Sequence, residues 1–185
     1  METPPNPQNQ QAIIPDSNTP KLYDPKQYLF LGFFLSLVPV FYMSITNCKY
    51  YPNGEKIKKT MMKFLAVFVG LIVLNFALIL WAVIQMQKFV LSLYNTSTDI
   101  PKELELPLTI VENSDLFFIG ANIILLIVVT RYTNKNELPL FQEEIANKKA
   151  TINNMLMPFI IGLIFVGGMY FGASELLYSI ALMLV

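Results

Sequence analysis

Residues 64–84 read FLAVFVGLIVLNFALILWAVI, a run of 21 residues without a single charge. A helix rises about 1.5 Å per residue, so about 20 apolar residues cross the hydrocarbon core of a bilayer, which is about 30 Å thick. The helical apolar pattern continues past this run in QMQKFVLSLY. The sequence therefore predicts a membrane-spanning helix over 63–94, with its last turns along the membrane interface.

Three further apolar runs indicate an all-α fold, a polytopic membrane protein with a four-helix transmembrane bundle. We expect helices over 28–48, 115–132 and 154–174, because these runs are long and almost uncharged. Pro39 is expected to kink the first helix, since proline removes one backbone hydrogen bond. The C-terminal residues 175–185 either continue the fourth helix or form a short extra segment.

The overall composition agrees with this prediction. Apolar residues make up 54% of the chain and charged residues 14%, whereas soluble domains have about 45–50% and about 25%. The 13 basic and 13 acidic residues cancel, and no long basic stretch is present. We therefore expect the lipid bilayer as a partner and no interaction with nucleic acid.

The first 22 residues differ from the rest of the chain. The segment 1–22 is rich in proline and glutamine and has few apolar residues. Such a composition cannot bury enough apolar surface to offset the entropy of ordering. We expect a disordered tail over 1–22, followed by one transmembrane domain over 23–185.

Several kinds of chemistry are excluded by residue content. The chain has no histidine, which removes histidine-ligated haem and zinc and the Ser-His-Asp triad. Cys48 is the only cysteine, so no intrachain disulfide can form. No paired carboxylates stand at membrane depth to supply a catalytic base. The sequence predicts no catalytic residues, no metal site and no cofactor, and the protein is expected not to be an enzyme.

Basic residues set the expected orientation, because cytoplasmic loops carry an excess of lysine and arginine. The loops after the first and third predicted helices contain nine of them: Lys49, Lys56, Lys58, Lys59, Lys63, Arg131, Lys135, Lys148 and Lys149. With four crossings, these two loops face the cytoplasm and the N-terminus lies outside.

Three polar residues are candidate intramembrane contacts. Asn75 and Asn122 stand near the middle of their apolar runs, and Glu175 is a carboxylate between two apolar stretches. A buried amide needs a hydrogen-bond partner, so the two asparagines are expected to join helices or to bind a polar solute. An intramembrane carboxylate suggests an ion or proton site, although Glu175 is also expected to lie near the outer boundary.

Two shorter patterns suggest packing surfaces. Gly168 and Gly172 have the small-xxx-small spacing that lets helices approach closely, either within the bundle or between copies. Apolar residues recur at helical spacing over 138–152, with Pro139 in a position suited to a first turn. This second pattern predicts an amphipathic helix on the inner membrane surface, in contact with lipid, the bundle or a cytosolic partner.

The segment Leu22-Tyr23-Asp24-Pro25-Lys26-Gln27, which leads into the first apolar run, resembles part of a known group. It is similar to small uncharacterised bacterial multi-pass membrane proteins with a proline-rich N-terminal tail and an LY-x-P-x-Q motif before the first helix. The similarity extends over about residues 20–60. It implies a bacterial cytoplasmic (inner) membrane and no particular activity.

These observations favour a non-enzymatic role. We expect an accessory or structural membrane subunit that acts through helix contacts with itself, as a homo-oligomer, or with a membrane protein partner. The alternative is an oligomeric pore-forming or transport protein, of the holin-like or toxin-like kind. A pore former should carry a continuous polar stripe, and Ser36, Asn75 and Asn122 do not form one.

Overall fold

The computed structural model describes residues 19–93, 105–147 and 149–183. Its elements in chain order are β1 (Lys21–Leu22), η2 (Pro25–Gln27), α1 (Tyr28–Leu35), α2 (Val38–Asn47), η3 (Cys48–Tyr50), α3 (Gly54–Leu93), α4 (Glu105–Asn136), α5 (Leu138–Ala146), β2 (Thr151–Ile152) and α6 (Leu156–Met183). The fold is all-α apart from one pair of two-residue strands. The expected tail 1–22 lies mostly outside the described residues.

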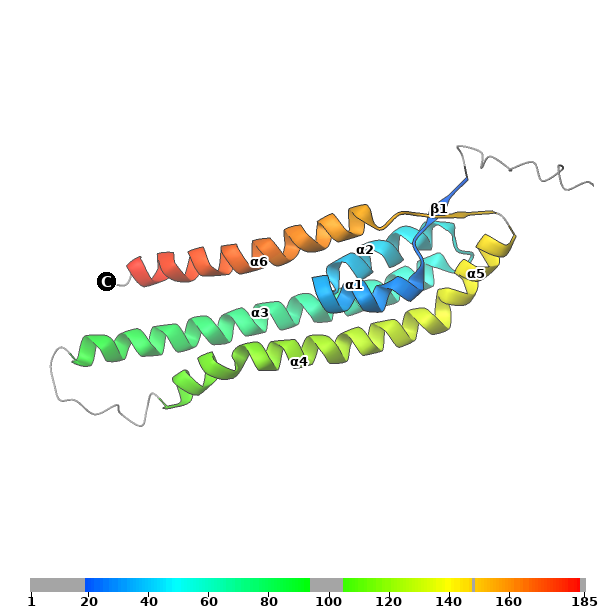
Figure 1. Cartoon of the computed structure of the whole chain (residues 1–185). Coiled ribbons are helices and arrows are strands. Elements are labelled where there is room, and N and C mark those ends of the chain that lie inside the picture. Colours follow the sequence, from blue (N-terminus) through cyan, green and yellow to red (C-terminus); the bar gives the residue numbers. More distant parts are fainter. Residues whose placement is uncertain (1–18, 94–104, 148, 184–185) are drawn as a thin grey trace, which may run out of the picture.

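Figure 1 shows α3, α4 and α6 running along the length of the molecule, with α1 and α2 beside them at one end. That end also carries β1, β2 and α5, and we call it the proximal end. The C-terminal ends of α3 and α6 and the N-terminal end of α4 lie at the opposite, distal end. The core cluster of buried apolar side chains gathers where α1 and α2 meet the long helices.

The first apolar run does not form the continuous helix expected over 28–48. The chain breaks at Ser36, whose φ of 81° is outside the helical region, and α2 starts two residues later. Pro39 stands in the first turn of α2. Proline clashes with the preceding turn but suits the start of a helix, so it separates two helices here instead of kinking one.

These two short helices form a hairpin that turns back on itself. Tyr28, the first residue of α1, accepts a hydrogen bond of 3.0 Å from the side chain of Asn47, the last residue of α2. Both ends of the hairpin therefore lie at the proximal end. An eight-residue helix is only about 12 Å long, so α1 cannot cross a bilayer. The prediction of one continuous helix over 28–48 is therefore wrong, and the four-helix transmembrane bundle is not confirmed.

Two described helices are long and apolar enough to cross a membrane. The apolar stretches are Gly54–Lys88 in α3 and Leu116–Asn136 in α4. In their most apolar windows only 11% and 22% of the residues are buried. The third predicted span, 115–132, lies within the much longer α4.

The fourth predicted helix is longer than expected. The helix α6 continues without a break from Leu156 to Met183, through Gly172, so residues 154–174 and the described part of 175–185 do not form separate segments. The helix is 28 residues long, and Glu175 is its only charged residue.

Close backbone contacts hold the hairpin against its neighbours. A Cβ atom at Gly162 of α6 would lie 2.7 Å from the Leu35 Cβ and 2.8 Å from the Pro39 Cγ. A Cβ at Gly32 of α1 would lie 2.3 Å from a methyl carbon of Leu126 in α4. Only glycine allows these approaches without a shift of the neighbouring side chains. The hairpin is therefore packed between α6 and α4.

The proximal end is also joined by backbone hydrogen bonds and by α5. The strands β1 and β2 pair in parallel, with Lys21 opposite Thr151 and Leu22 opposite Ile152. The predicted amphipathic helix over 138–152 is present as α5, which ends at Ala146, and Pro139 lies in its first turn. Its apolar side packs on the protein core, since Phe141 is only 6% exposed.

Candidate functional site: a buried polar network around Glu137

Glu137 stands between α4 and α5 and is completely buried. Its backbone N–H donates to the Thr133 carbonyl (2.8 Å), and its own carbonyl accepts from the Phe141 N–H (2.8 Å). The backbone hydrogen-bond pattern of the two helices thus continues through this residue. Glu137 is fixed where α4 passes into α5, and its side chain lies against the α1–α2 hairpin.

The Glu137 carboxylate accepts hydrogen bonds from both arms of the hairpin. The Tyr28 hydroxyl of α1 donates to Oε2 at 3.1 Å, and the Ser44 hydroxyl of α2 donates to Oε1. The Asn47 amide donates in turn to the Tyr28 hydroxyl at 3.0 Å. Every donor in this chain of bonds is oriented toward the carboxylate, the arrangement that favours its ionised form.

The same network reaches the N-terminal segment. The Asn47 amide also donates to the Tyr23 carbonyl at 2.7 Å, and its Oδ1 accepts from the Tyr23 N–H at 2.8 Å. Tyr28, Ser44 and Asn47 are as fully buried as Glu137. We call these four residues, with the Tyr23 backbone, the Glu137 network. It connects the segment before α1, both helices of the hairpin and the α4–α5 junction.

Burial raises the pKa of Glu137 from 4.5 to about 7. The hydrogen bonds from Ser44 and Tyr28 act in the opposite direction, because they stabilise the charged form. The only salt bridge in the described part of the chain joins Lys58 to Glu55, so no described cation pairs with Glu137. Burial therefore outweighs hydrogen bonding, and Glu137 changes its charge near neutral pH.

The negative charge of Glu137 also acts on the neighbouring Cys48 thiol. Cys48, at the end of α2, is buried, and its pKa rises to about 12, mainly through burial and secondarily through the negative charge of Glu137. A thiol with such a pKa is protonated at neutral pH and reacts slowly. Burial therefore favours an inert Cys48.

The geometry suits a positioning role better than a catalytic one. A pocket of about 270 Å³ lies nearby, lined by Asn136 and Pro139 on either side of Glu137 but not by Glu137 itself. With no exposed atom, the carboxylate reaches neither this pocket nor solvent. The carboxylate instead binds the α1–α2 hairpin through two hydrogen bonds, and the strength of these bonds depends on its charge.

Asn75 and Asn122, the candidate intramembrane contacts, lie at the same depth of the bundle. The rings of Phe64 in α3 and Tyr132 in α4 are 5.6 Å apart, and the two helices are antiparallel. Asn75 and Asn122 are each about 15 Å along their helices from that contact. The Asn122 amide donates to the Phe118 carbonyl at 2.8 Å, whereas the Oδ1 atoms of both asparagines are buried without a hydrogen bond. The two amides therefore do not bond to each other.

The other predicted site residues are on the surface of α6. Glu175 is exposed, and it forms no contact with the Glu137 network. A Cβ at Gly168 or Gly172 would meet no atom within 4 Å. These two glycines do not pack against the described residues of their own chain; Gly32 and Gly162 have that role.

Sequence reasoning missed Glu137 altogether. It stands in the polar segment TNKNELP, where a solvated loop residue is the ordinary interpretation, and nothing local separates it from the exposed Glu143. Tyr28 and Ser44, its partners, are 109 and 93 residues away in sequence. The only local signal is the Leu-Pro that follows Glu137, which marks the start of a new helix.

Comparisons of the chain with protein-family models, with curated proteins and with solved structures found no match.

Proposed function

We propose that this chain is an integral membrane protein with a non-enzymatic role, an accessory or structural subunit that acts through helix contacts with itself or a partner. One observation carries the proposal: the long apolar helices are left largely uncovered by the rest of the chain, with 11% and 22% of their apolar windows buried. A core helix of a soluble protein is mostly buried, and α3 and α4 are not.

The exposed apolar surface extends over all the long helices and over α1. Soluble monomers rarely expose a contiguous apolar patch larger than a few hundred Å². Side chains more than 60% exposed include Phe30, Phe33, Phe34, Val73, Leu116, Ile124, Leu156, Ile164 and Phe171. Lipid or a partner helix covers such a surface without cost, because both are apolar.

The hairpin changes the topology that we propose. Every described lysine or arginine except Lys88 lies at the proximal end or within three turns of it. Lysine-rich ends face the cytoplasm. We therefore place the proximal end in the cytoplasm, with α1 and α2 entering the membrane and returning to the same side. The segment before α1 is then cytoplasmic, not outside as a first crossing would require. The resemblance of residues 20–60 favours a bacterial cytoplasmic membrane.

Cysteine labelling tests this topology. In a Cys48→Ser background, single cysteines replace the exposed Lys21, Lys59 and Lys88. A membrane-impermeant maleimide added to intact cells is expected to label only the Lys88→Cys protein. All three should react after the membrane is opened.

The comparison of Lys21→Cys with Lys59→Cys is the decisive one, because the α1–α2 hairpin lies between them. If that segment crossed the membrane, the two positions would react on opposite sides. Labelling of Lys21→Cys from outside would therefore rule out a hairpin that returns. Equal labelling of all three positions in intact cells would rule out insertion.

Helix contacts of α6 are a second testable part of the proposal. Gly168 and Gly172 are one turn apart on α6, exposed and free of contacts within 4 Å. Gly168→Leu is expected to leave the monomer folded but to lower association with a second copy or a partner by about tenfold. The measurement is the mass of the complex purified in mild detergent, together with identification of any co-purified protein.

Gly70→Leu is the matched control, since Gly70 lies on the apolar part of α3 and is equally open. It should not change the mass of the complex. A wild-type protein that is a monomer without partners at cellular expression levels would contradict the accessory role. Association that survives Gly168→Leu would place the contact on another helix face.

The second candidate function is transport of a polar solute by an oligomer. The buried, unpaired Oδ1 atoms of Asn75 and Asn122, at one depth of adjacent helices, favour it, because a buried amide oxygen without a hydrogen bond costs about 1–3 kcal/mol. A solute or water would satisfy both atoms. Solute flux into vesicles that contain only this protein, and its loss in Asn75→Leu, would distinguish transport from an accessory role.

A further inference from the structure

We propose that a groove between α1 and the start of α6 binds an anionic phospholipid, with Lys26 at the phosphate and one acyl chain along the apolar wall. The inference rests on the proposed membrane location. It goes beyond that location by assigning a specific lipid site, with stated residues, to one face of the proximal end.

The groove has a volume of about 620 Å³ and is open on one side, within the range of about 300–1,000 Å³ of most small-molecule sites. Its lining comes from two segments that are more than 120 residues apart. Lys26 and Gln27 of η2 and Phe30 and Leu31 of α1 form one part, and Met155, Leu156 and Phe159 at the start of α6 form the other. The hairpin fold brings these two segments together.

The lining divides into a polar mouth and an apolar wall. Lys26 and Gln27 are polar and exposed, at the last residues before α1. Leu31 is 4% exposed and forms the floor, while Phe30 and Leu156 remain 63% and 61% exposed along the sides. A phospholipid matches this arrangement, because its charged phosphate would lie at the polar mouth and its acyl chain along the apolar wall.

Lys26 is well placed to bind a phosphate. Its backbone is held in place, because the Lys26 N–H donates a hydrogen bond of 2.9 Å to the Asp24 side chain, which caps the start of η2. Its ammonium group takes part in no salt bridge among the described residues. The exposed Lys21 of β1 adds a second positive charge at this end. Charge complementarity therefore favours an anionic over a zwitterionic lipid.

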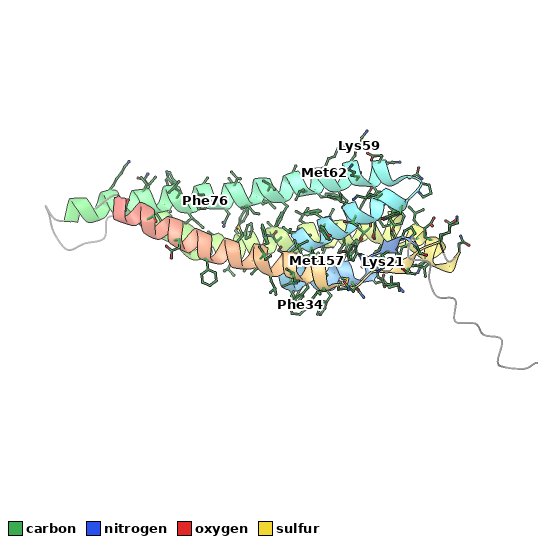
Figure 2. The ribbon with its side chains drawn as sticks, turned by 90° about the horizontal axis from the view of Figure 1, so that it is seen from above. Lys21, Phe34, Lys59, Met62, Phe76 and Met157 are labelled. Atoms are coloured by element: carbon green, nitrogen blue, oxygen red, sulfur yellow. The ribbon has the colours of Figure 1, made fainter. Side chains whose placement is uncertain are left out.

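The depth of the groove agrees with this occupant. Lys26 precedes the first turn of α1, and Met155 precedes the first turn of α6, so the polar mouth lies at the proximal boundary and the apolar wall extends into the bundle. Figure 2 shows Lys21 and Met157 on this side of the molecule, with Phe34 of α1 pointing away from the bundle. Lys59 and Met62 lie on α3, on the opposite side.

Native mass spectrometry of the full chain tests the proposal. The protein is purified in mild detergent with equal amounts of phosphatidylglycerol and phosphatidylcholine, and the retained lipids are counted. The wild-type protein is expected to retain one phosphatidylglycerol. Lys26→Gln should lower the ratio of retained phosphatidylglycerol to phosphatidylcholine by about fivefold. Leu156→Trp, which fills the groove, should remove both lipids.

The matched controls come from the opposite side of the bundle. Lys59→Gln removes an exposed lysine and Met62→Trp enlarges an exposed apolar residue of α3, and both should retain lipid as the wild-type protein does. Equal phosphatidylglycerol retention by the wild-type, Lys26→Gln and Leu156→Trp proteins would overturn the site while leaving membrane insertion intact. A chain that does not insert into vesicles at all would instead overturn the proposed function.

Discussion

The double substitution Tyr28→Phe and Ser44→Ala is expected to lower the free energy of unfolding by about 2–4 kcal/mol at pH 8. Each hydrogen bond to a charged group is worth about 1.5–3 kcal/mol, and protonation of Glu137 relieves part of the loss. Both hydroxyls donate to the Glu137 carboxylate, and all three side chains are fully buried. Without these donors the pKa of Glu137 rises further, so the buried carboxyl group of the double variant takes up a proton at the expense of stability. Denaturant titration in mild detergent measures the loss.

The expected loss depends on pH, and its sign follows from the pKa of Glu137. In the folded wild-type protein this pKa is about 7 instead of 4.5, so the folded state keeps a proton that the unfolded chain releases. Stability of the wild-type protein therefore falls as pH rises from about 4.5 to about 7, by about 3 kcal/mol, and is level above that. At pH 5 Glu137 is neutral, and the double variant should lose only about 1–3 kcal/mol.

Adding Glu137→Leu separates hydrogen bonding from packing. The triple variant has no buried charge, and the Asn47 amide, which loses the Tyr28 hydroxyl, keeps its hydrogen bonds to the Tyr23 backbone. Replacing a whole polar group by apolar residues is often nearly neutral. It should regain at least half of the stability that the double variant loses at pH 8. The exposed Tyr50→Phe is the control and should change little. A triple variant as unstable as the double one would show that the hydroxyls act through packing alone.

The second large effect is expected from Gly54→Ala at the start of α3. A Cβ atom there would lie 1.7 Å from the Cys48 backbone oxygen and 2.7 Å from its carbonyl carbon. Backbone atoms cannot move aside as a side chain can, so the turn between η3 and α3 must shift. We expect the free energy of unfolding to fall by about 2–3 kcal/mol or more, the usual result of overpacking.

The same substitution at Gly70, in the same helix, is expected to have the opposite sign. A Cβ at Gly70 meets no atom within 4 Å, and alanine favours a helix interior over glycine by about 0.5–1 kcal/mol. Denaturant titration of the two variants side by side gives the comparison. Equal stability of Gly54→Ala and the wild-type protein would mean that the turn from Cys48 to Gly54 is looser than its geometry indicates.

The long apolar helices are the part of this protein that its sequence determined. An uncharged run such as 64–84 needs only local backbone hydrogen bonds and an apolar surrounding, so length and composition suffice to predict α3. The helix α5 followed from its spacing and from Pro139 in the same way. The lysine distribution predicts which loops face the cytoplasm, because it depends on composition and not on packing, and that orientation stays a prediction.

The hairpin, the Glu137 network and the groove beside α1 were decided by the tertiary structure alone. Composition cannot tell a run that crosses the membrane from one that turns back, since both are apolar; the break at Ser36 and the contact between Tyr28 and Asn47 make the difference. Glu137 looks like a loop residue until the hairpin covers it. Its burial depends on hydroxyls about a hundred residues away, whose positions only the packing of α1 and α2 against α4 and α6 determines.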